Sequence, residues 1–296
     1  MILNIDIPLG NWVESAVDWL SANASVFFDG ITIGVDSMVT SLQKVLLFPP
    51  PFVIIILFAI LAYGMASKGH KPFTKGALKA GGGTALFTIL GFLLLQVMGY
   101  WEETMQSIAL ILVSALIALV IGIPLGVYAA RHDTAEKIIR PILDFMQTLP
   151  PFVYLIPAII FFQVGNVPGV IATIVFSLPP AVRFTNLGIR NVQEDVVEAS
   201  KAFGCTKRQL LYKVQIPLAK PTIFAGVNQV IMLSLSMVVI ASMVGAAGLG
   251  QSVYKGILKA DMALGFEAGV GIVILAIFLD RVTQSLSISK KQVEEE

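Results

Sequence analysis

Long apolar stretches alternate with short charged segments along most of this 296-residue chain. A helix needs about 20 apolar residues to cross a bilayer, because backbone polar groups cannot stay unpaired in hydrocarbon. Seven stretches approach or exceed this length and predict membrane-spanning helices, and the fifth is the shortest because it ends at Leu178-Pro179-Pro180. The predicted spans are 47–66, 81–99, 105–130, 143–163, 168–182, 222–245 and 264–283.

The first 46 residues are amphipathic instead of uniformly apolar. Apolar residues recur at helical spacing between Trp12 and Leu20, while Glu14 and Asp18 fall on the opposite face. This periodicity predicts a helix that either lies flat in the membrane interface or packs on a helical bundle. We therefore interpret 1–46 as an extracytoplasmic, interfacial region that precedes the spans.

The composition supports an integral membrane protein. Hydrophobic residues make up 56% of the chain, charged residues make up 13%, and the mean hydropathy is +0.84, whereas an ordinary soluble domain has about 25% charged residues. One cysteine excludes an intrachain disulfide and a cysteine-based metal cluster, and both histidines, His70 and His132, lie in charged segments. The sequence therefore predicts neither a metal site nor a Ser/His/Asp catalytic arrangement.

Basic residues indicate the orientation of the chain, because lysine and arginine concentrate in cytoplasmic loops. With the N-terminus outside, 17 of the 20 basic residues fall on the cytoplasmic side with 10 acidic residues, giving that side a net charge of +7. The opposite side then holds 3 basic and 9 acidic residues, a net charge of −6. This distribution predicts an extracytoplasmic N-terminus, a cytoplasmic C-terminus and a charged cytoplasmic tail at 286–296.

The segment 183–220 is the one predicted cytoplasmic loop long enough to hold structure of its own. Its pattern predicts a helix, a turn and a second helix. Val196, Ala199 and Phe203 form an apolar stripe on the first helix, and Gly204 supplies the left-handed residue that commonly ends a helix. A short helix on the cytoplasmic face is well placed to dock into a partner.

The second helix of this segment has its own start and stop signals. Thr206 and Gln209 have the spacing of a capping box, in which each residue satisfies a backbone donor of the other. Pro217 and Pro221 are expected to end the helix, because proline removes a backbone donor and clashes with the preceding turn.

Two other interpretations of the segment are open. A helix, a glycine turn and a helix carrying Lys207 and Arg208 also suit a DNA-binding helix-turn-helix, but membrane spans tether both ends and a third packing helix is lacking. The remaining alternative is a structured loop whose basic side chains extend along the membrane surface.

A longer motif passes through the same segment. Glu198-Ala199-Ser200 is followed after three residues by Gly204, and after nine more residues by Val214-Gln215-Ile216-Pro217. This resembles the EAA motif of ABC importer permeases, which reads E-A-A, three residues, G, nine residues, I-x-L-P, with mild departures at Ser200, Val214 and Ile216. In that family the loop is the coupling helix, seated in a cleft of the ATPase subunit. The resemblance implies contact with the ATPase for Glu198, Ala199, Ser200, Gly204, Val214, Ile216 and Pro217.

The similarity extends over roughly residues 100–285 and is more specific than the EAA motif alone. Four further segments are similar to the permease subunit of glycine betaine/proline betaine ABC importers: MQTLPPFVYL at 146–155, GNVPG at 165–169, SLSMVVIASM at 234–243 and GLGQ at 248–251. This resemblance implies an all-α integral membrane protein of about seven transmembrane helices, with a five-helix, MetI-like type I importer core at 100–285. The two spans within 47–99 are then accessory. The resemblance also implies a homodimer that assembles with two ATP-binding cassette ATPase subunits and an extracytoplasmic substrate-binding protein.

The energy source is expected in another chain. No G-x-x-x-x-G-K-[ST] phosphate-binding loop occurs in the sequence, so ATP and its magnesium are expected on a partner ATPase, and this chain is expected not to be an enzyme. Ionisable residues are scarce within the predicted spans, where ion-coupled carriers usually place carboxylates. A secondary carrier acting without an ATPase is therefore the less favoured alternative. A membrane enzyme would need a nucleophile or metal constellation, and nothing suggests a nucleic-acid partner.

A betaine is a zwitterion with a methylated ammonium, a cation that aromatic rings bind through their faces. Polar residues in the spans, with one tyrosine, form a candidate substrate path: Gln147, Tyr154, Asn228, Gln229, Ser234 and Ser236. For each residue alone, a hydrogen bond that joins two helices is the alternative role.

We therefore expect a permease subunit of an ATP-driven importer in a bacterial inner membrane, which takes up a quaternary-ammonium osmoprotectant by alternating access. Glycine betaine and proline betaine are the substrates that the resemblance implies. Choline and carnitine are alternatives, because most of the selectivity is expected in the binding protein.

Overall fold

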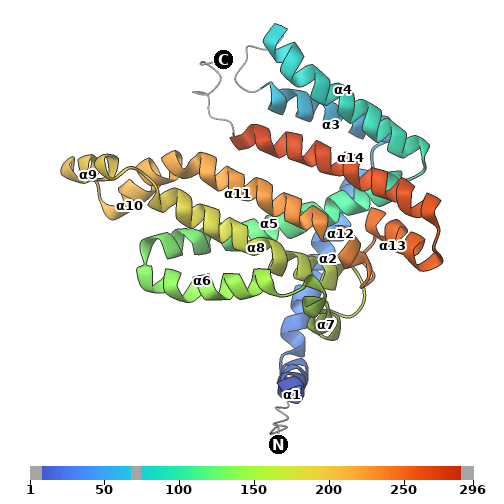
Figure 1. The fold of residues 1–296 in the computed structure, drawn as a ribbon, viewed down its shortest axis with the longest axis horizontal. Coiled ribbons are helices and arrows are strands. Elements are labelled where there is room, and N and C mark those ends of the chain that lie inside the picture. Colours follow the sequence, from blue (N-terminus) through green and yellow to red (C-terminus); the bar gives the residue numbers. More distant parts are fainter. Residues whose placement is uncertain (1–8, 68–74, 288–296) are drawn as a thin grey trace, which may run out of the picture.

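The computed structural model describes residues 9–67 and 75–287, and every regular element within these ranges is a helix (Figure 1). The predicted all-α fold is confirmed. Residues 1–8 of the amphipathic region, residues 68–74 between the first two predicted spans, and residues 288–296 of the predicted charged tail lie outside the described residues.

Four long helices form the body of the molecule: α5 (Trp101–Arg131), α8 (Asn166–Arg190), α11 (Ile216–Ser236) and α14 (Met262–Ser287). Each overlaps one of the predicted spans, and each is long and apolar enough to cross a membrane, α11 as part of the continuous stretch Lys207–Ser242. These helices lie side by side and run roughly along the long axis of the molecule (Figure 1).

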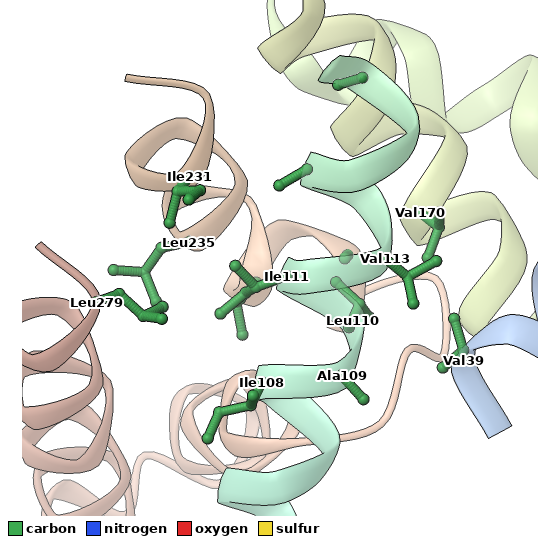
Figure 2. Close-up of a cluster of buried hydrophobic side chains, with 14 of the residues drawn as sticks. Val39, Ile108, Ala109, Leu110, Ile111, Val113, Val170, Ile231, Leu235 and Leu279 are labelled. Atoms are coloured by element: carbon green, nitrogen blue, oxygen red, sulfur yellow. The ribbon is translucent and has the colours of Figure 1, made fainter. Parts of the chain in front are cut away.

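The core surrounds α5, which has neighbours on several sides. Figure 2 shows Leu110 and Val113 on the side of α5 that faces α8 and α2, and Ile111 on the side that faces α11 and α14. Because several faces of α5 are buried, its sequence has to be apolar all round instead of along one stripe. The buried neighbours labelled in Figure 2 are Val39, Val170, Ile231, Leu235 and Leu279.

Glycines bring α5, α8 and α11 into close contact, as small residues commonly do between membrane helices. A Cβ added at Gly122 of α5 would lie 2.5 Å from the Cβ of Ala181 on α8, and one at Gly126 would lie 2.7 Å from the carbonyl oxygen of Val182. Gly226 of α11 approaches α8 equally closely. The three helices therefore pack nearly backbone to backbone.

The two predicted accessory spans correspond to α3 (Pro51–Ala66) and α4 (Lys75–Val97), which pack together and on α14 at one edge of the body (Figure 1). Phe58 of α3, Phe92 of α4 and Phe278 of α14 join the three helices, with ring centroids 5.1–5.2 Å apart. These rings contribute buried apolar area together with edge-to-face contacts.

The amphipathic region forms two helices, α1 (Leu9–Asn23) and α2 (Ser25–Leu47). α2 meets α3 at an angle of 101°, buries Val39 against the body, and stacks the ring of Phe28 on that of Phe161 with centroids 4.3 Å apart. α1 leaves both of its tryptophans more than 60% exposed. α2 thus packs on the bundle, and the interfacial position of α1 stays a prediction.

The predicted span 143–163 is wrong as a continuous helix. It is divided between α6 (Asp133–Thr148) and α7 (Pro151–Phe162), which are bent by 97° at the break. The sequence Leu149-Pro150-Pro151 explains the bend, because proline lacks a backbone donor and disfavours the helical conformation in the residue before it. Leu149 is accordingly extended, with ψ 134°.

The predicted span 168–182 is too short. α8 continues through Pro179 and Pro180, both of them buried, and ends only at Arg190. Neighbouring helices in a membrane compensate for the backbone groups that proline leaves unpaired, which is why proline is tolerated there. The segment predicted as a loop from residue 183 therefore starts after Arg190.

Two shorter helices, α12 (Val238–Ser242) and α13 (Leu249–Lys259), follow α11. The turn between them is tied to α5, because the backbone N–H of Leu249 donates a buried hydrogen bond of 2.8 Å to the Oγ of Ser107. α13 was not predicted as a separate helix, since its sequence has fewer apolar residues than a span.

Within the described residues, four helices are long and apolar enough to span a membrane, and up to six spans result if each bent pair counts as one. The apolar part of α4, Gly81–Val97, is a shorter helix. The chain is thus a multi-pass helical membrane protein, and the count of seven spans stays a prediction.

Candidate functional site

α9 (Glu194–Ala202) projects from the end of the body opposite to α13 (Figure 1). None of its residues is buried. The predicted apolar stripe is largely uncovered, because Val196 is only half-buried, Ala199 is exposed and Phe203 is 90% exposed. The ring of Phe203 is thus uncovered within the described part of the chain and leaves an apolar surface at the end of α9.

The turn after α9 has the predicted glycine conformation. Gly204 has a φ of +80°, its N–H donates to the carbonyl of Lys201 (2.9 Å), and the N–H of Cys205 donates to that of Ser200 (3.2 Å). This pair of hydrogen bonds is the Schellman arrangement, which satisfies the last carbonyls of a helix and requires a left-handed residue. The position of Gly204 fixes the direction in which the chain leaves α9.

The predicted capping box is confirmed at the start of α10 (Lys207–Gln209). The N–H of Thr206 donates to the Oε1 of Gln209 (2.9 Å), and the N–H of Gln209 donates to the Oγ1 of Thr206 (3.3 Å). Because the cap lies directly after the glycine turn, the two local motifs together set the angle between α9 and α10.

The prediction that Pro217 and Pro221 end the second helix is wrong. α10 passes into a π-helical segment, η1 (Leu210–Gln215), and then directly into α11, which contains both prolines. In the wide turn of η1 the N–H of Ile216 bonds to the carbonyl of Leu211, five residues back. Pro217 therefore stands near the start of the resumed α-helix, where its missing N–H costs little.

The two halves of the EAA-like motif differ in exposure. Glu198 and Ala199 are exposed and Ser200 is half-buried, with its Oγ donating to the carbonyl of Val196 (2.7 Å). In the second half, Val214 and Ile216 are half-buried and Pro217 is exposed. Leu211, next to that half, is buried with Ile189 and Ala219. The motif therefore joins a projecting helix to a segment anchored in the body.

Asn228 has a structural role in this conformation. Its Nδ2 donates to the Oδ1 of Asp280 (3.4 Å), and its Oδ1 accepts a hydrogen bond from the hydroxyl of Thr283. Both partners lie on α14, so Asn228 joins α11 to α14, which is the helix-joining role considered above.

The other residues of the candidate path do not gather around one cavity. Tyr154 donates a hydrogen bond to the carbonyl of Met146 across the break between α6 and α7, and Gln147 is half-buried beside the break. On α11, the hydroxyl of Ser234 is buried and bonds within its own helix, whereas Gln229 and Ser236 are exposed. The cavity of about 390 Å³ between α6 and α8 is lined by other residues.

Sequence reasoning missed the ion pairs that join α6 to α8 beside that cavity. Arg190 forms ion pairs with the carboxylates of Asp133 and Glu136, and Arg183 forms one with Asp144. The charge distribution predicted all five charged groups on the same side of the membrane. Their pairing depends on how α6 and α8 are rotated, which sequence spacing alone does not give. Within the described residues, no three His, Cys, Asp or Glu side chains converge for a metal ion.

The fold defines the class of protein. It is similar to a chain of the inward-facing MetNI methionine ABC transporter, with a TM-score of 0.56 over 66% of this chain and 97% of that chain at 24% identity. The chain therefore shares its helical fold with a chain of an ABC transporter. Residues 122–287 match the family described as binding-protein-dependent transport system inner membrane component, and the chain belongs to this family.

Relatives with curated names are similar over nearly the whole chain. The glycine betaine transport system permease protein OpuAB of Bacillus subtilis is 47% identical over 96% of both chains. The glycine betaine/proline betaine permease ProW of Escherichia coli is 48% identical over 95% of this chain and 75% of its own length. The glycine betaine/carnitine permease GbuB of Listeria monocytogenes is 47% identical over 95% of this chain and 96% of its own. The resemblance to betaine permeases is confirmed.

Proposed function

We propose that this chain is the permease subunit of an ATP-driven importer for glycine betaine or proline betaine. The proposal rests on sequence identity: over at least 95% of its length, this chain is 47–48% identical to permeases named for glycine betaine and proline betaine. A choline permease, OpuBB of Bacillus subtilis, is less similar, at 31% identity over 61% of this chain. Carnitine is a closer alternative, because GbuB carries it in its name.

The proposed complex contains two copies of this chain, two ATPase subunits and an extracytoplasmic binding protein. ATP and magnesium bind to the ATPase subunits, and this chain supplies the path through the bacterial inner membrane. We propose that α9 and α10 face the cytoplasm, with the N-terminus outside and the C-terminus inside, as the excess of basic residues on that side suggests.

We propose that the segment from α9 to η1 is the docking segment for the ATPase. Glu198, Ala199 and the ring of Phe203 are exposed and available to a cleft in the partner. Gly204 sets the angle between α9 and α10, while Val214, Ile216 and Pro217 connect the segment to α11. The lack of buried residues in α9 supports this role, because a helix that buries so little surface contributes little to the stability of the isolated subunit.

Transport then follows by alternating access. Closure of the ATPase dimer around ATP displaces the docking segment, and the two permease cores rock to open outward toward the loaded binding protein. Hydrolysis reverses the movement. The tighter binding of ATP to the closed ATPase dimer provides the free energy, since a ligand shifts an equilibrium only by its differential affinity for the two states.

The test is uptake of radiolabelled glycine betaine into proteoliposomes that contain this chain with its ATPase, with binding protein outside and ATP inside. We expect uptake only when ATP, the ATPase and the binding protein are all present. Uptake by the permease alone, or uptake unaffected by removal of ATP, would show an ion-coupled carrier or a channel instead.

The substrate is tested separately by titrating the binding protein with glycine betaine, proline betaine, choline and carnitine. Competition by each ligand for betaine uptake in the proteoliposomes should follow the same order of affinity. If the ligand that the binding protein holds most tightly is not taken up, selectivity lies in the permease. In that case, Gln229, Ser236 and Tyr154 would be the first residues to substitute.

A further inference from the structure

Arg190 is the last residue of α8, four positions before α9 begins. Its guanidinium contacts groups on two other elements. Nη2 donates to the carbonyl of Ala129 (3.1 Å) and to the Oδ1 of Asp133 (2.7 Å), and it forms an ion pair with the Oε2 of Glu136 (3.0 Å). Nε donates to the Oδ1 of Asn186 (3.0 Å), whose amide in turn donates to Glu136 (3.1 Å).

Apart from Asn186, which lies on α8 itself, these partners belong to the junction between α5 and α6. Ala129 lies in the last turn of α5, where the final carbonyls of a helix have no partner within the helix. Asp133 and Glu136 lie in the first turn of α6. A cation at the C-terminus of one helix and carboxylates at the N-terminus of the next are both favoured by the helix dipoles. Arg190 therefore satisfies both helix ends with one planar group.

Few apolar contacts hold α6 in this place. Leu143 is its one buried residue, and the cavity of about 390 Å³ separates much of α6 from α8. The remaining ion pair across the cavity, between Arg183 and Asp144, joins side chains that are 43% and 54% exposed. Exposed pairs of this kind contribute little because water screens them. The carboxylate of Asp133 is 79% exposed and is screened in the same way, whereas Glu136 is 30% exposed. The contacts of Glu136 with Arg190 and Asn186 are thus the principal polar link between α6 and α8.

We infer that Arg190 is a positioning residue for energy coupling: it makes the α5–α6 junction move together with the docking segment. This inference rests on the proposed function. Displacement of α9 acts on the end of α8, and Arg190 passes that displacement to α5, the central helix, and to α6. Without this link, the docking segment can follow the ATPase while the α5–α6 junction stays behind.

The experiment uses the complete transporter in proteoliposomes and measures two rates, ATP hydrolysed and glycine betaine taken up. We expect Arg190→Gln to keep ATP hydrolysis close to that of the wild type while the ATP used per betaine rises about fivefold or more, the lower end of typical coupling effects. Arg183→Gln is the matched control, because it removes the other arginine from the same two helices. For Arg183→Gln, the ATP used per betaine taken up should equal that of the wild type.

The partner side provides a second set of variants. Asp133→Asn with Glu136→Gln should raise the ratio as Arg190→Gln does, and the triple variant should cause no further rise, because residues of one network are not additive. An unchanged ratio in Arg190→Gln would overturn the inference. So would equal effects of Arg183→Gln and Arg190→Gln, or a parallel fall of uptake and hydrolysis, which a merely structural residue would cause. Failure of the wild type to import betaine with ATP would instead overturn the proposed function.

Discussion

The contact between α5 and α8 at Gly126 gives a prediction whose size follows from the structure. In Gly126→Ala, the new Cβ would lie 2.6 Å from the Cβ of Thr185 and 2.7 Å from the carbonyl oxygen of Val182. Non-bonded carbon atoms prefer separations of about 3.5–4.0 Å, so the two helices have to part by roughly 1 Å. One of the two obstructing atoms belongs to the backbone of α8 and cannot rotate away.

Two terms of opposite sign determine the result. Overpacking of this kind costs about 1–3 kcal/mol, while replacing glycine by alanine inside a helix gains up to about 1 kcal/mol. Gly34→Ala on α2 isolates the second term, because nothing lies within 4 Å of the Cβ that it adds. We expect Gly126→Ala to be less stable than Gly34→Ala by about 1–3 kcal/mol.

The assay is thermal stability of the purified subunit in detergent, followed as the fraction that stays monodisperse after brief heating. Both variants have the same chemical change, and both positions lie inside helices, so the comparison cancels the effect on helix propensity. If Gly126→Ala withstands heating as well as Gly34→Ala, then α5 and α8 do not pack as closely as described, and the reasoning is refuted.

Three further predictions follow from single contacts. Gly204→Asp forces a residue with a Cβ into a φ of +80° and adds a charge to the docking segment. If docking weakens by about 1.4 kcal/mol, ATP-driven uptake per inserted permease falls roughly tenfold, and normal uptake would contradict the assignment of the segment. Thr206→Ala removes the capping box at a cost of about 1 kcal/mol, so amide hydrogen exchange over residues 206–215 should become several times faster while that of α5 stays unchanged. Ser107→Ala leaves the buried N–H of Leu249 unpaired and should lower thermal stability by about 1–3 kcal/mol, whereas Ser236→Ala, at an exposed hydroxyl, should have no effect.

Hydropathy predicted the helices whose sequences are apolar without interruption, α5 and α14 above all. It failed at two pairs of adjacent prolines, and in opposite directions. Pro150 and Pro151 break the predicted span 143–163 into α6 and α7, but Pro179 and Pro180 are accommodated within α8. The difference lies in the surroundings, because α8 is enclosed between α5 and α11. A sequence pattern does not contain that information.

Local motifs of the candidate site were predictable because they do not depend on the surroundings. The glycine turn at Gly204 and the capping box of Thr206 and Gln209 depend only on residues a few positions apart, and both are present. The continuation of the helix through Pro217 was not predictable, since it depends on the π-helical turn of η1 and on the burial of Leu211 beside α8. The ion pairs of Arg190 depend on helix rotation and appear only in three dimensions.

The unbroken helical stretch from Lys207 to Ser242 has a mechanical consequence. It contains 36 residues, which at about 1.5 Å per residue is a rod of about 54 Å. A tilt of about 5° around one end would shift the other end by about 5 Å, close to one helical turn. A small rotation imposed at α10 is therefore enlarged at the far end of the rod, where α12 contacts α13, so that this end can open or close by the width of a small molecule.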